Sequence, residues 1–155
     1  MGNPSDSSSA RPIDLLQVKD KLVAASSDLY YVSEGDEPLE FVFFENKELE
    51  RLPESAELFA DLTTNLDSSH AQEEIKTERV DKDQFFAPLT ISDHDPYGQQ
   101  EKYKKLEQTM EELFGSDNVQ VYKVKGRLYS TTEIYIVGLI RGMGIAGIQT
   151  RSIET

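Results

Sequence analysis

The sequence predicts an α+β domain in which helices pack on a mainly antiparallel sheet, and three observations support this fold class. Residues 133–140 are β-branched, aromatic and apolar on both alternating faces, which is typical of a central strand covered on both sides. Residues 15–29 repeat apolar side chains at steps of three and four, as an amphipathic helix does. The predicted elements follow in the order helix, strand, a less regular middle, helix and a run of antiparallel strands.

The length of 155 residues suits one domain with a substantial core. Residues 1–11 are Ser-rich and polar, so we expect a disordered tail there and a single domain over residues 12–155. No apolar run approaches bilayer length, and no charged region followed by an apolar one opens the sequence. We therefore expect no membrane association and a cytoplasmic location.

The formal net charge is -13, from 29 acidic and 16 basic residues. An electrostatically guided partner should therefore be positive or carry a metal cation, and nucleic acid is disfavoured as a direct ligand. The count of 0 Cys excludes disulfides, thiolate metal sites and a cysteine nucleophile. Taken alone, such a charge is also typical of a protein kept soluble by self-repulsion.

The first predicted elements are a helix, an acidic turn and a strand. Asp14 is the expected N-cap of the helix, which should end near residues 26–28 and pack on the sheet. Residues 33–38 are acidic and include Gly and Pro, which predicts a turn. Residues 40–45 are apolar almost throughout and predict a strand.

The middle of the chain gives weaker signals. Residues 46–76 are predicted to be a surface insertion, with a short helix opening at Pro53 and a polar loop over residues 65–74. Residues 75–80 favour another strand. Residues 84–89 favour an anchoring turn whose two Phe side chains enter the core.

A second long helix is predicted to start at Asp95, its cap, with Pro96 in its first position, and to end at Gly115. Its apolar face consists of Tyr103, Leu106, Met110 and Leu113. A strand over residues 119–125 and the central strand follow. After a Gly-rich turn, residues 145–155 are long enough to run back antiparallel and bring residues 153–155 to the sheet edge, where a free carboxylate would end a rigid element.

Two patterns suggest chemistry that the surrounding sequence does not support. Residues 142–147 match the GxGxxG dinucleotide fingerprint, but β-like sequence follows where the fingerprint needs a helix, so a hairpin turn is predicted. His70 and His94 are the two histidines, and without Cys companions they favour neither a zinc site nor a catalytic dyad. No spacing singles out two carboxylates for acid-base work. We expect a protein that is not an enzyme and uses no cofactor.

Several short segments, taken in order, resemble the family of cyanobacterial nuclease A inhibitors. The likeness covers most of the chain from Asp14 onward and is strongest in the first helix with its acidic turn and in the C-terminal hairpin. Residues 46–76 do not share it, and extra residues are expected there. The segments that carry the resemblance are 28–34, 38–42, 95–97, 121–122, 136–138, 146–150 and 154–155.

The resemblance implies an α-β-α sandwich with a central, mainly antiparallel sheet, and inhibition of a metal-dependent endonuclease that cleaves DNA and RNA without sugar specificity. In the family a C-terminal threonine reaches the nuclease metal and an acidic residue after the first helix approaches it, which implies Thr155 and Glu34 here. Asp95 matches the acidic member of an Asp-Trp pair, but Pro96 stands where the family has tryptophan. Loss of that aromatic anchor should alter partner choice or affinity, and Tyr97 is placed to compensate.

The expected site binds a partner and holds no metal of its own. It comprises Glu34, Asp95, Pro96, Tyr97, Glu154 and Thr155. A divalent cation in a basic cleft prefers oxygen ligands, so Thr155 and Glu34 would take the place of a substrate phosphate at the partner's metal. We expect a monomer that forms a 1:1 complex with the nuclease.

Other interpretations stay open. An acidic interaction module or nucleic-acid mimic would bind a different basic protein through rows of carboxylates, and it would tolerate loss of Thr155. A hydrolase would need convergent carboxylates in a deep pocket. Each proposed site residue also has a purely structural interpretation. Glu34 would be a solvated turn residue, Asp95 a helix cap, and the C-terminal residues a fraying strand end.

Overall fold

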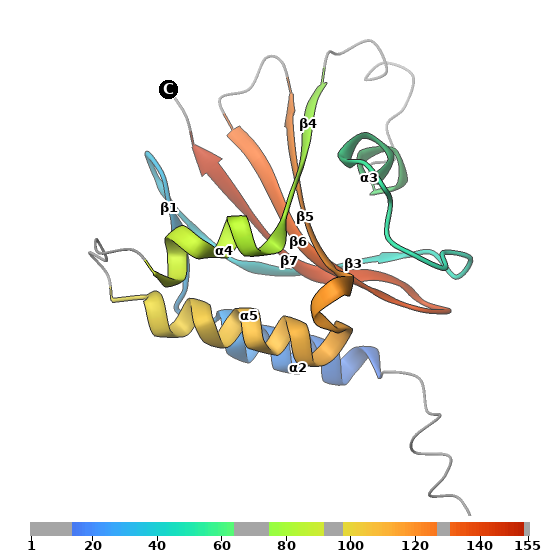
Figure 1. Cartoon of the computed structure of the whole chain (residues 1–155), viewed down its shortest axis with the longest axis horizontal. Coiled ribbons are helices and arrows are strands. Elements are labelled where there is room, and N and C mark those ends of the chain that lie inside the picture. Colours follow the sequence, from blue (N-terminus) through green and yellow to red (C-terminus); the bar gives the residue numbers. More distant parts are fainter. Residues whose placement is uncertain (1–13, 64–74, 92–97, 127–130, 154–155) are drawn as a thin grey trace, which may run out of the picture.

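The computed structural model describes residues 14–63, 75–91, 98–126 and 131–153, and these form a five-stranded antiparallel sheet with helices on both faces (Figure 1). The sheet order is β3-β7-β6-β5-β4, and a two-stranded hairpin, β1-β2, is separate from it. The strands are β1 (Tyr30–Val32), β2 (Asp36–Pro38), β3 (Glu40–Glu45), β4 (Ile75–Val80), β5 (Val119–Gly126), β6 (Thr131–Ile140) and β7 (Gly144–Ile153). The helices are α2 (Leu15–Ser26), α3 (Ala56–Thr63), α4 (Lys82–Thr90) and α5 (Gln100–Phe114), followed by the short 3-10 helix η1 (Ser116–Asn118). The predicted α+β class is confirmed.

Strand β6 is the middle strand of the sheet, as predicted, and it is buried on both faces. Ile134 and Ile136 belong to the core cluster beneath α2, α4 and α5. Tyr135 and Val137 belong to the second cluster, beneath α3. Helices cover both faces of the strand, so the side chains on both of its faces are apolar.

Helix α2 begins and packs as its sequence predicts. The Leu16 N–H donates to the Asp14 carboxylate at 3.0 Å, which satisfies one free amide of the first turn. Val18 and Leu22 are fully buried against the sheet. The three- and four-residue spacing therefore marks the face that the helix buries.

Helix α5 ends at Gly115 as predicted but begins at Gln100, so the predicted start at Asp95 is wrong. Gly98 has φ +64, a left-handed conformation that a helix cannot include. On its apolar face, Tyr103, Leu106 and Met110 are buried, as expected.

Residues 84–89 are part of helix α4 and do not form the predicted turn. Asp81 caps this helix, because its carboxylate accepts from the Asp83 and Gln84 N–H groups at 3.1 and 3.3 Å. Pro88 lies in the last turn, where its missing N–H does not prevent the helix from forming. The prediction that Phe85 and Phe86 enter the core is confirmed.

The predicted acidic turn is shorter than expected. Residues 36–38 form strand β2, which pairs with β1 so that Tyr31 lies opposite Glu37 and Tyr30 opposite Pro38. A proline is tolerated there because the hairpin strand is short and lies outside the main sheet. The turn itself is confined to residues 33–35.

Within residues 46–76, helix α3 covers the second face of the sheet. Phe59 is fully buried and stacks on Tyr122, with ring centroids 4.3 Å apart and 7° between the planes. The Tyr122 hydroxyl donates to the Pro53 carbonyl at 2.6 Å and so fixes the start of this segment on the sheet. The domain limits and the status of residues 46–76 as an insertion stay predictions.

Strand β7 returns antiparallel to β6 after a Gly-rich turn, as predicted, and residues 142–147 form no helix. Gly142 and Gly144 have φ angles of +80° and +150°, which residues with a side chain rarely adopt, so glycine suits both positions of the turn. Strand β3 pairs with β7 up to Gln149, so residues 150–153 extend past β3 to the end of the sheet. Among the described helices, none combines the length and apolarity needed to cross a bilayer.

Candidate functional site

The turn between β1 and β2 carries Glu34, the candidate residue that the structure describes. The Ser33 N–H and hydroxyl both donate to the Gly35 carbonyl, at 3.0 and 3.3 Å, and close the turn tightly. Glu34 is exposed at its tip. The turn therefore holds an acidic side chain at the surface on a short, hydrogen-bonded hairpin.

This turn is bonded directly to the end of β7. The Glu34 N–H donates to the Ile153 carbonyl at 3.2 Å, and the Ile153 N–H donates to the Ser33 hydroxyl at 2.8 Å. Further along the strand, the Thr150 hydroxyl donates to the Pro38 carbonyl at 3.0 Å. The hairpin and the end of β7 thus lie side by side as one unit (Figure 1).

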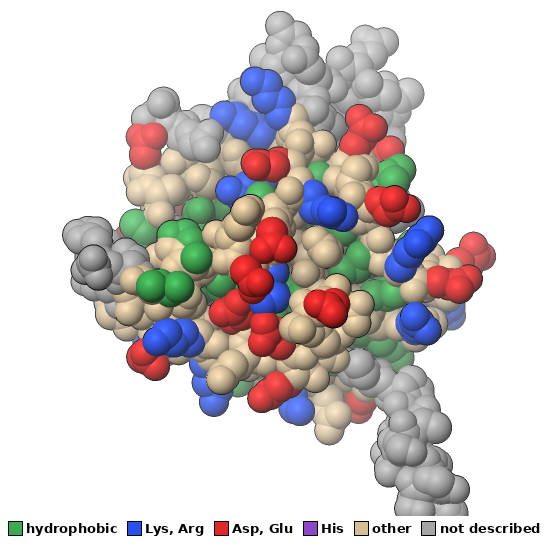
Figure 2. Space-filling model, viewed as in Figure 1, with side chains coloured by type: hydrophobic (Ala, Val, Ile, Leu, Met, Phe, Trp, Pro, Cys, Tyr) green, Lys and Arg blue, Asp and Glu red, His purple; other side chains and the backbone are tan. Residues whose placement is uncertain are grey.

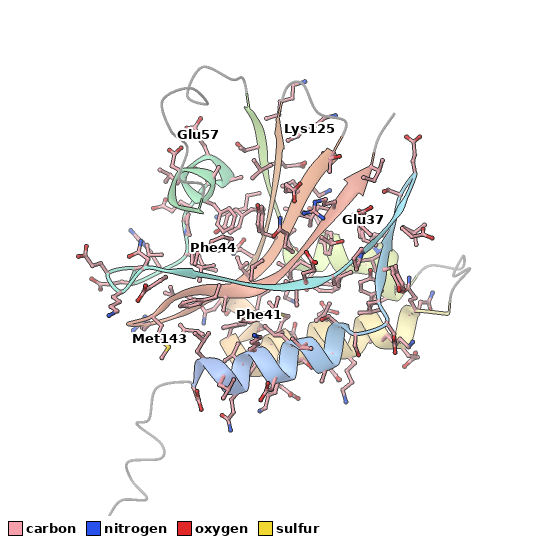
Figure 3. All side chains as sticks on the ribbon, turned by 180° about the vertical axis from the view of Figure 1, so that it is seen from behind. Glu37, Phe41, Phe44, Glu57, Lys125 and Met143 are labelled. Carbon is pink, nitrogen blue, oxygen red and sulfur yellow. The ribbon has the colours of Figure 1, made fainter. Side chains whose placement is uncertain are left out.

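An ion-pair network also fixes this end of β7. The Arg151 Nε donates to the Glu133 carboxylate at 3.1 Å, and a second guanidinium nitrogen lies 3.7 Å from the Glu37 carboxylate. The Glu133 carboxylate is the main cause that raises the pKa of Arg151. Gln149 also donates to Glu133, at 2.6 Å. Arg151 therefore links β6, β7 and the hairpin. Figure 3 shows Glu37 near the end of β7.

Gln99 joins the hairpin to the start of α5. Its side-chain oxygen accepts from the Tyr30 N–H at 2.7 Å, and its side-chain nitrogen donates to the Tyr30 carbonyl at 3.0 Å. The Tyr103 hydroxyl donates to the same carbonyl at 2.8 Å. Pro38 lies opposite Tyr30 and has no N–H to donate. The side chains of Gln99 and Tyr103 therefore form hydrogen bonds with the Tyr30 backbone instead.

Gln99 was not predicted from the sequence. The residue is 7 % exposed, and its side chain bonds to the Tyr30 backbone as a neighbouring strand would. Its position in a polar stretch before a helix does not indicate this role. In the sequence it follows the predicted contact residues at 95–97 by two positions. Its contacts fix the start of α5 against the hairpin.

Of the predicted partner-binding residues, Glu34 is placed next to Ile153, the residue before the predicted pair Glu154 and Thr155. These two lie outside the described residues. The predicted set Asp95, Pro96 and Tyr97 also lies outside them. Their roles stay predictions.

A second acidic cluster lies between α4 and α5. Asp83, Glu107 and Glu111 bring carboxylate oxygens within 4.8 Å of one another, a grouping that oxygen-liganded cations use. The Lys82 ammonium is already at its centre, 2.8 Å from Asp83, 3.1 Å from Glu107 and 2.5 Å from Glu111. Figure 2 shows acidic side chains gathered over these two helices. The cluster is therefore a structural ion-pair network.

Replacing Gln99 by Leu is expected to lower the free energy of unfolding by about 2 kcal/mol, because the Tyr30 N–H loses its partner near a buried side chain. Hydrogen exchange should accelerate at the Tyr30 amide, and chemical denaturation measures the stability loss. Gln108→Leu, at an exposed position of α5, is the matched control. Equal effects of the two substitutions would show that Gln99 does not anchor the hairpin.

Comparison with protein families gives one extensive match. A family described as nuclease A inhibitor-like protein matches residues 16–155, which is nearly the whole chain. The match includes the hairpin, α5 and β7, the elements that the contacts above tie together. Comparison with curated proteins gives no significant match.

Proposed function

Since the chain belongs to the nuclease A inhibitor-like family, a family of inhibitors, we propose that it blocks a sugar-non-specific, metal-dependent endonuclease by occupying its active-site cleft. In this role the protein binds and does not catalyse, and it brings no cofactor or metal of its own. A monomer forms a 1:1 complex with the nuclease. The family match supports the inhibitor role, and the residues that carry it are part of the proposal.

The observation that supports this mechanism best is the pair of hydrogen bonds between the Ser33–Glu34 turn and Ile153. They hold the Glu34 backbone beside the residue that precedes Glu154 and Thr155. An interface whose parts are fixed before binding loses less conformational entropy on association. The turn and the end of β7 at Ile153 are therefore positioned relative to each other before binding.

The functional groups proposed for the interface suit a hard cation. In the proposal the Glu34 carboxylate and the Thr155 hydroxyl approach the nuclease metal, which prefers oxygen ligands, while Glu154 pairs with basic groups around it. Asp95 and Tyr97 add contacts beside the cleft, with Pro96 in place of an aromatic anchor. The net charge of -13 would accelerate association with a basic cleft and make the rate sensitive to salt.

Inhibition assays with a metal-dependent, sugar-non-specific nuclease test the proposal. Glu34→Gln and deletion of residues 154–155 should each weaken inhibition by roughly tenfold or more. Glu57→Gln removes an equal charge from α3, which Figure 3 shows on the other side of the molecule from Glu37, and should leave inhibition unchanged. Circular dichroism checks that each variant is folded. If both site variants inhibit like the wild type, the turn and tail have no part in the mechanism.

The same assay separates this mechanism from a nucleic-acid mimic. A mimic would keep its affinity when the nuclease metal is chelated and when residues 154–155 are removed. A metal-directed inhibitor should lose affinity in both cases. Binding measured by calorimetry with and without chelator gives this comparison independently of nuclease activity.

A further inference from the structure

We propose that this protein binds a small oxyanion of the phosphate type in a pocket at one end of the sheet, formed at the start of β4, the end of β5, the start of β6 and the end of β7. We call it the lysine pocket. It has a volume of about 440 Å³ and is lined by Lys76, Thr77, Glu78, Lys123, Lys125, Thr132 and Ser152. Small-molecule sites commonly have volumes of about 300–1,000 Å³.

The strand register places the main residues of the lysine pocket on one face. Lys76 lies opposite Lys125, Lys125 opposite Thr132, and Thr132 opposite Ser152. Directly opposed residues on neighbouring strands share a face, so these side chains form one row across four strands. Figure 3 shows Lys125 near the end of β5. The row continues the face that carries the main core, beyond its last buried apolar residues.

The charge of the lysine pocket is opposite to that of the whole molecule. Among the described residues, three lysines and one glutamate line it, with a formal charge of +2 in a chain of net charge -13. Lys76 lies directly opposite Lys125 on the neighbouring strand, so two ammonium-bearing side chains share this face of the lysine pocket. Lys76 and Lys123 form no ion pair with another described residue. Figure 2 shows basic side chains gathered over the ends of β4 and β5.

Hydroxyl groups complete the set of donors. Thr132 lines the lysine pocket with 8 % of its surface exposed, and its hydroxyl makes no hydrogen bond to another side chain among the described residues. Ser152 lies beside it on β7. Ammonium groups and hydroxyls donate hydrogen bonds and offer no negative charge, so together they suit a tetrahedral oxyanion and disfavour a metal cation.

Titration of the full chain with inorganic phosphate, followed by two-dimensional NMR at constant ionic strength, tests the proposal. Saturable shifts are expected at the amides of the lysine pocket. The double variant Lys76→Gln/Lys123→Gln should weaken binding by roughly tenfold or more, and Thr132→Val several-fold. Lys102→Gln/Lys105→Gln removes the same charge from exposed positions of α5 and should bind phosphate like the wild type.

A nucleoside 5′-monophosphate serves as the second probe. Tighter binding than inorganic phosphate would assign the site to a nucleotide phosphate, and equal binding would assign it to free phosphate. The proposal is wrong if chloride at the same ionic strength causes the same shifts, or if the α5 control loses as much affinity as the pocket variant. Because the titration uses the isolated protein, its outcome is independent of the inhibitor role.

Discussion

Raising the pH above about 10 is expected to unfold the protein between roughly pH 11 and 12, because three buried tyrosines keep their protons in the folded state. Tyr103, Tyr122 and Tyr135 are 2 %, 0 % and 8 % exposed. Burial raises the pKa of Tyr103 and of Tyr122, and it raises the pKa of Tyr135 to about 12. The hydroxyls of Tyr103 and Tyr122 also donate to the Tyr30 and Pro53 carbonyls, bonds that ionisation would break.

The sign of the effect follows from proton binding. The unfolded chain loses each phenol proton near pH 10, whereas the folded chain retains it until its raised pKa, so the folded state is favoured fully below pH 10 and progressively less above it. Each group contributes up to about 1.4 kcal/mol per pH unit in that window. Over one to two pH units, three such groups amount to about 4–8 kcal/mol, which reaches the lower part of the total stability of a typical domain, about 5–15 kcal/mol.

Absorbance of the phenolate form, followed together with far-ultraviolet circular dichroism, measures this transition without interference from tryptophan, since the chain contains 0 Trp. A late phase of phenolate absorbance should coincide with the loss of secondary structure. Tyr122→Phe removes one of the proton-linked groups and should make the loss of stability with pH less steep. Ionisation of all the tyrosines near pH 10 in a folded protein would contradict the expectation.

Lys82→Met is expected to lower the free energy of unfolding by about 3 kcal/mol, because it removes the one ammonium among three carboxylates. Lys82 is 6 % exposed and links its own helix α4 to Glu107 and Glu111 on α5. Burial lowers the pKa of Lys82, but hydrogen bonds to Asp83, Glu111 and Glu107 outweigh it and the net shift is upward. This contribution is fully present below the ordinary lysine pKa and is lost as the pH rises through the folded value, in the same direction as the tyrosines.

Denaturant unfolding compares Lys82→Met with two controls. Lys82→Arg keeps the charge and should cost less. Lys104→Met breaks an exposed pair with Glu101, 3.2 Å apart, and should cost less than about 1 kcal/mol. Adding Glu107→Gln and Glu111→Gln to Lys82→Met should restore stability, since the repulsion between the remaining carboxylates falls. A cost no larger than that of Lys104→Met would show that the cluster is not a stabilising network.

Elements with a strong local pattern could be predicted from the sequence. Strand β6 is apolar on both faces because the sheet is covered on both sides, and α2 buries the face marked by Val18 and Leu22. The elements that were predicted wrongly have competing local signals in the sequence. Residues 84–89 contain a proline that suggests a turn, yet Asp81 caps the helix and two buried Phe side chains hold it on the sheet.

The site was less predictable because its contacts join distant parts of the chain. Glu34 came from the family resemblance, and its acidic turn alone is equally typical of a solvated loop. Gln99 gave no signal, since its role depends on the Tyr30 backbone, 69 positions away. The lysine pocket depends on the register of four strands, and the spacing of its lysines along the sequence does not reveal their common face.

By itself the sequence determined the α+β class, the central strand and the amphipathic helices, since hydrophobic periodicity reports which side of an element is buried. The tertiary structure alone decided that the Ser33 hydroxyl meets the Ile153 N–H, 120 positions further along the chain. It also decided that Lys82 is enclosed by carboxylates from two helices, Asp83 of α4 and Glu107 and Glu111 of α5. Such contacts depend on how whole helices and strands are arranged in space. The residues that form these hydrogen bonds and ion pairs between elements are far apart in the sequence and show no periodic pattern there.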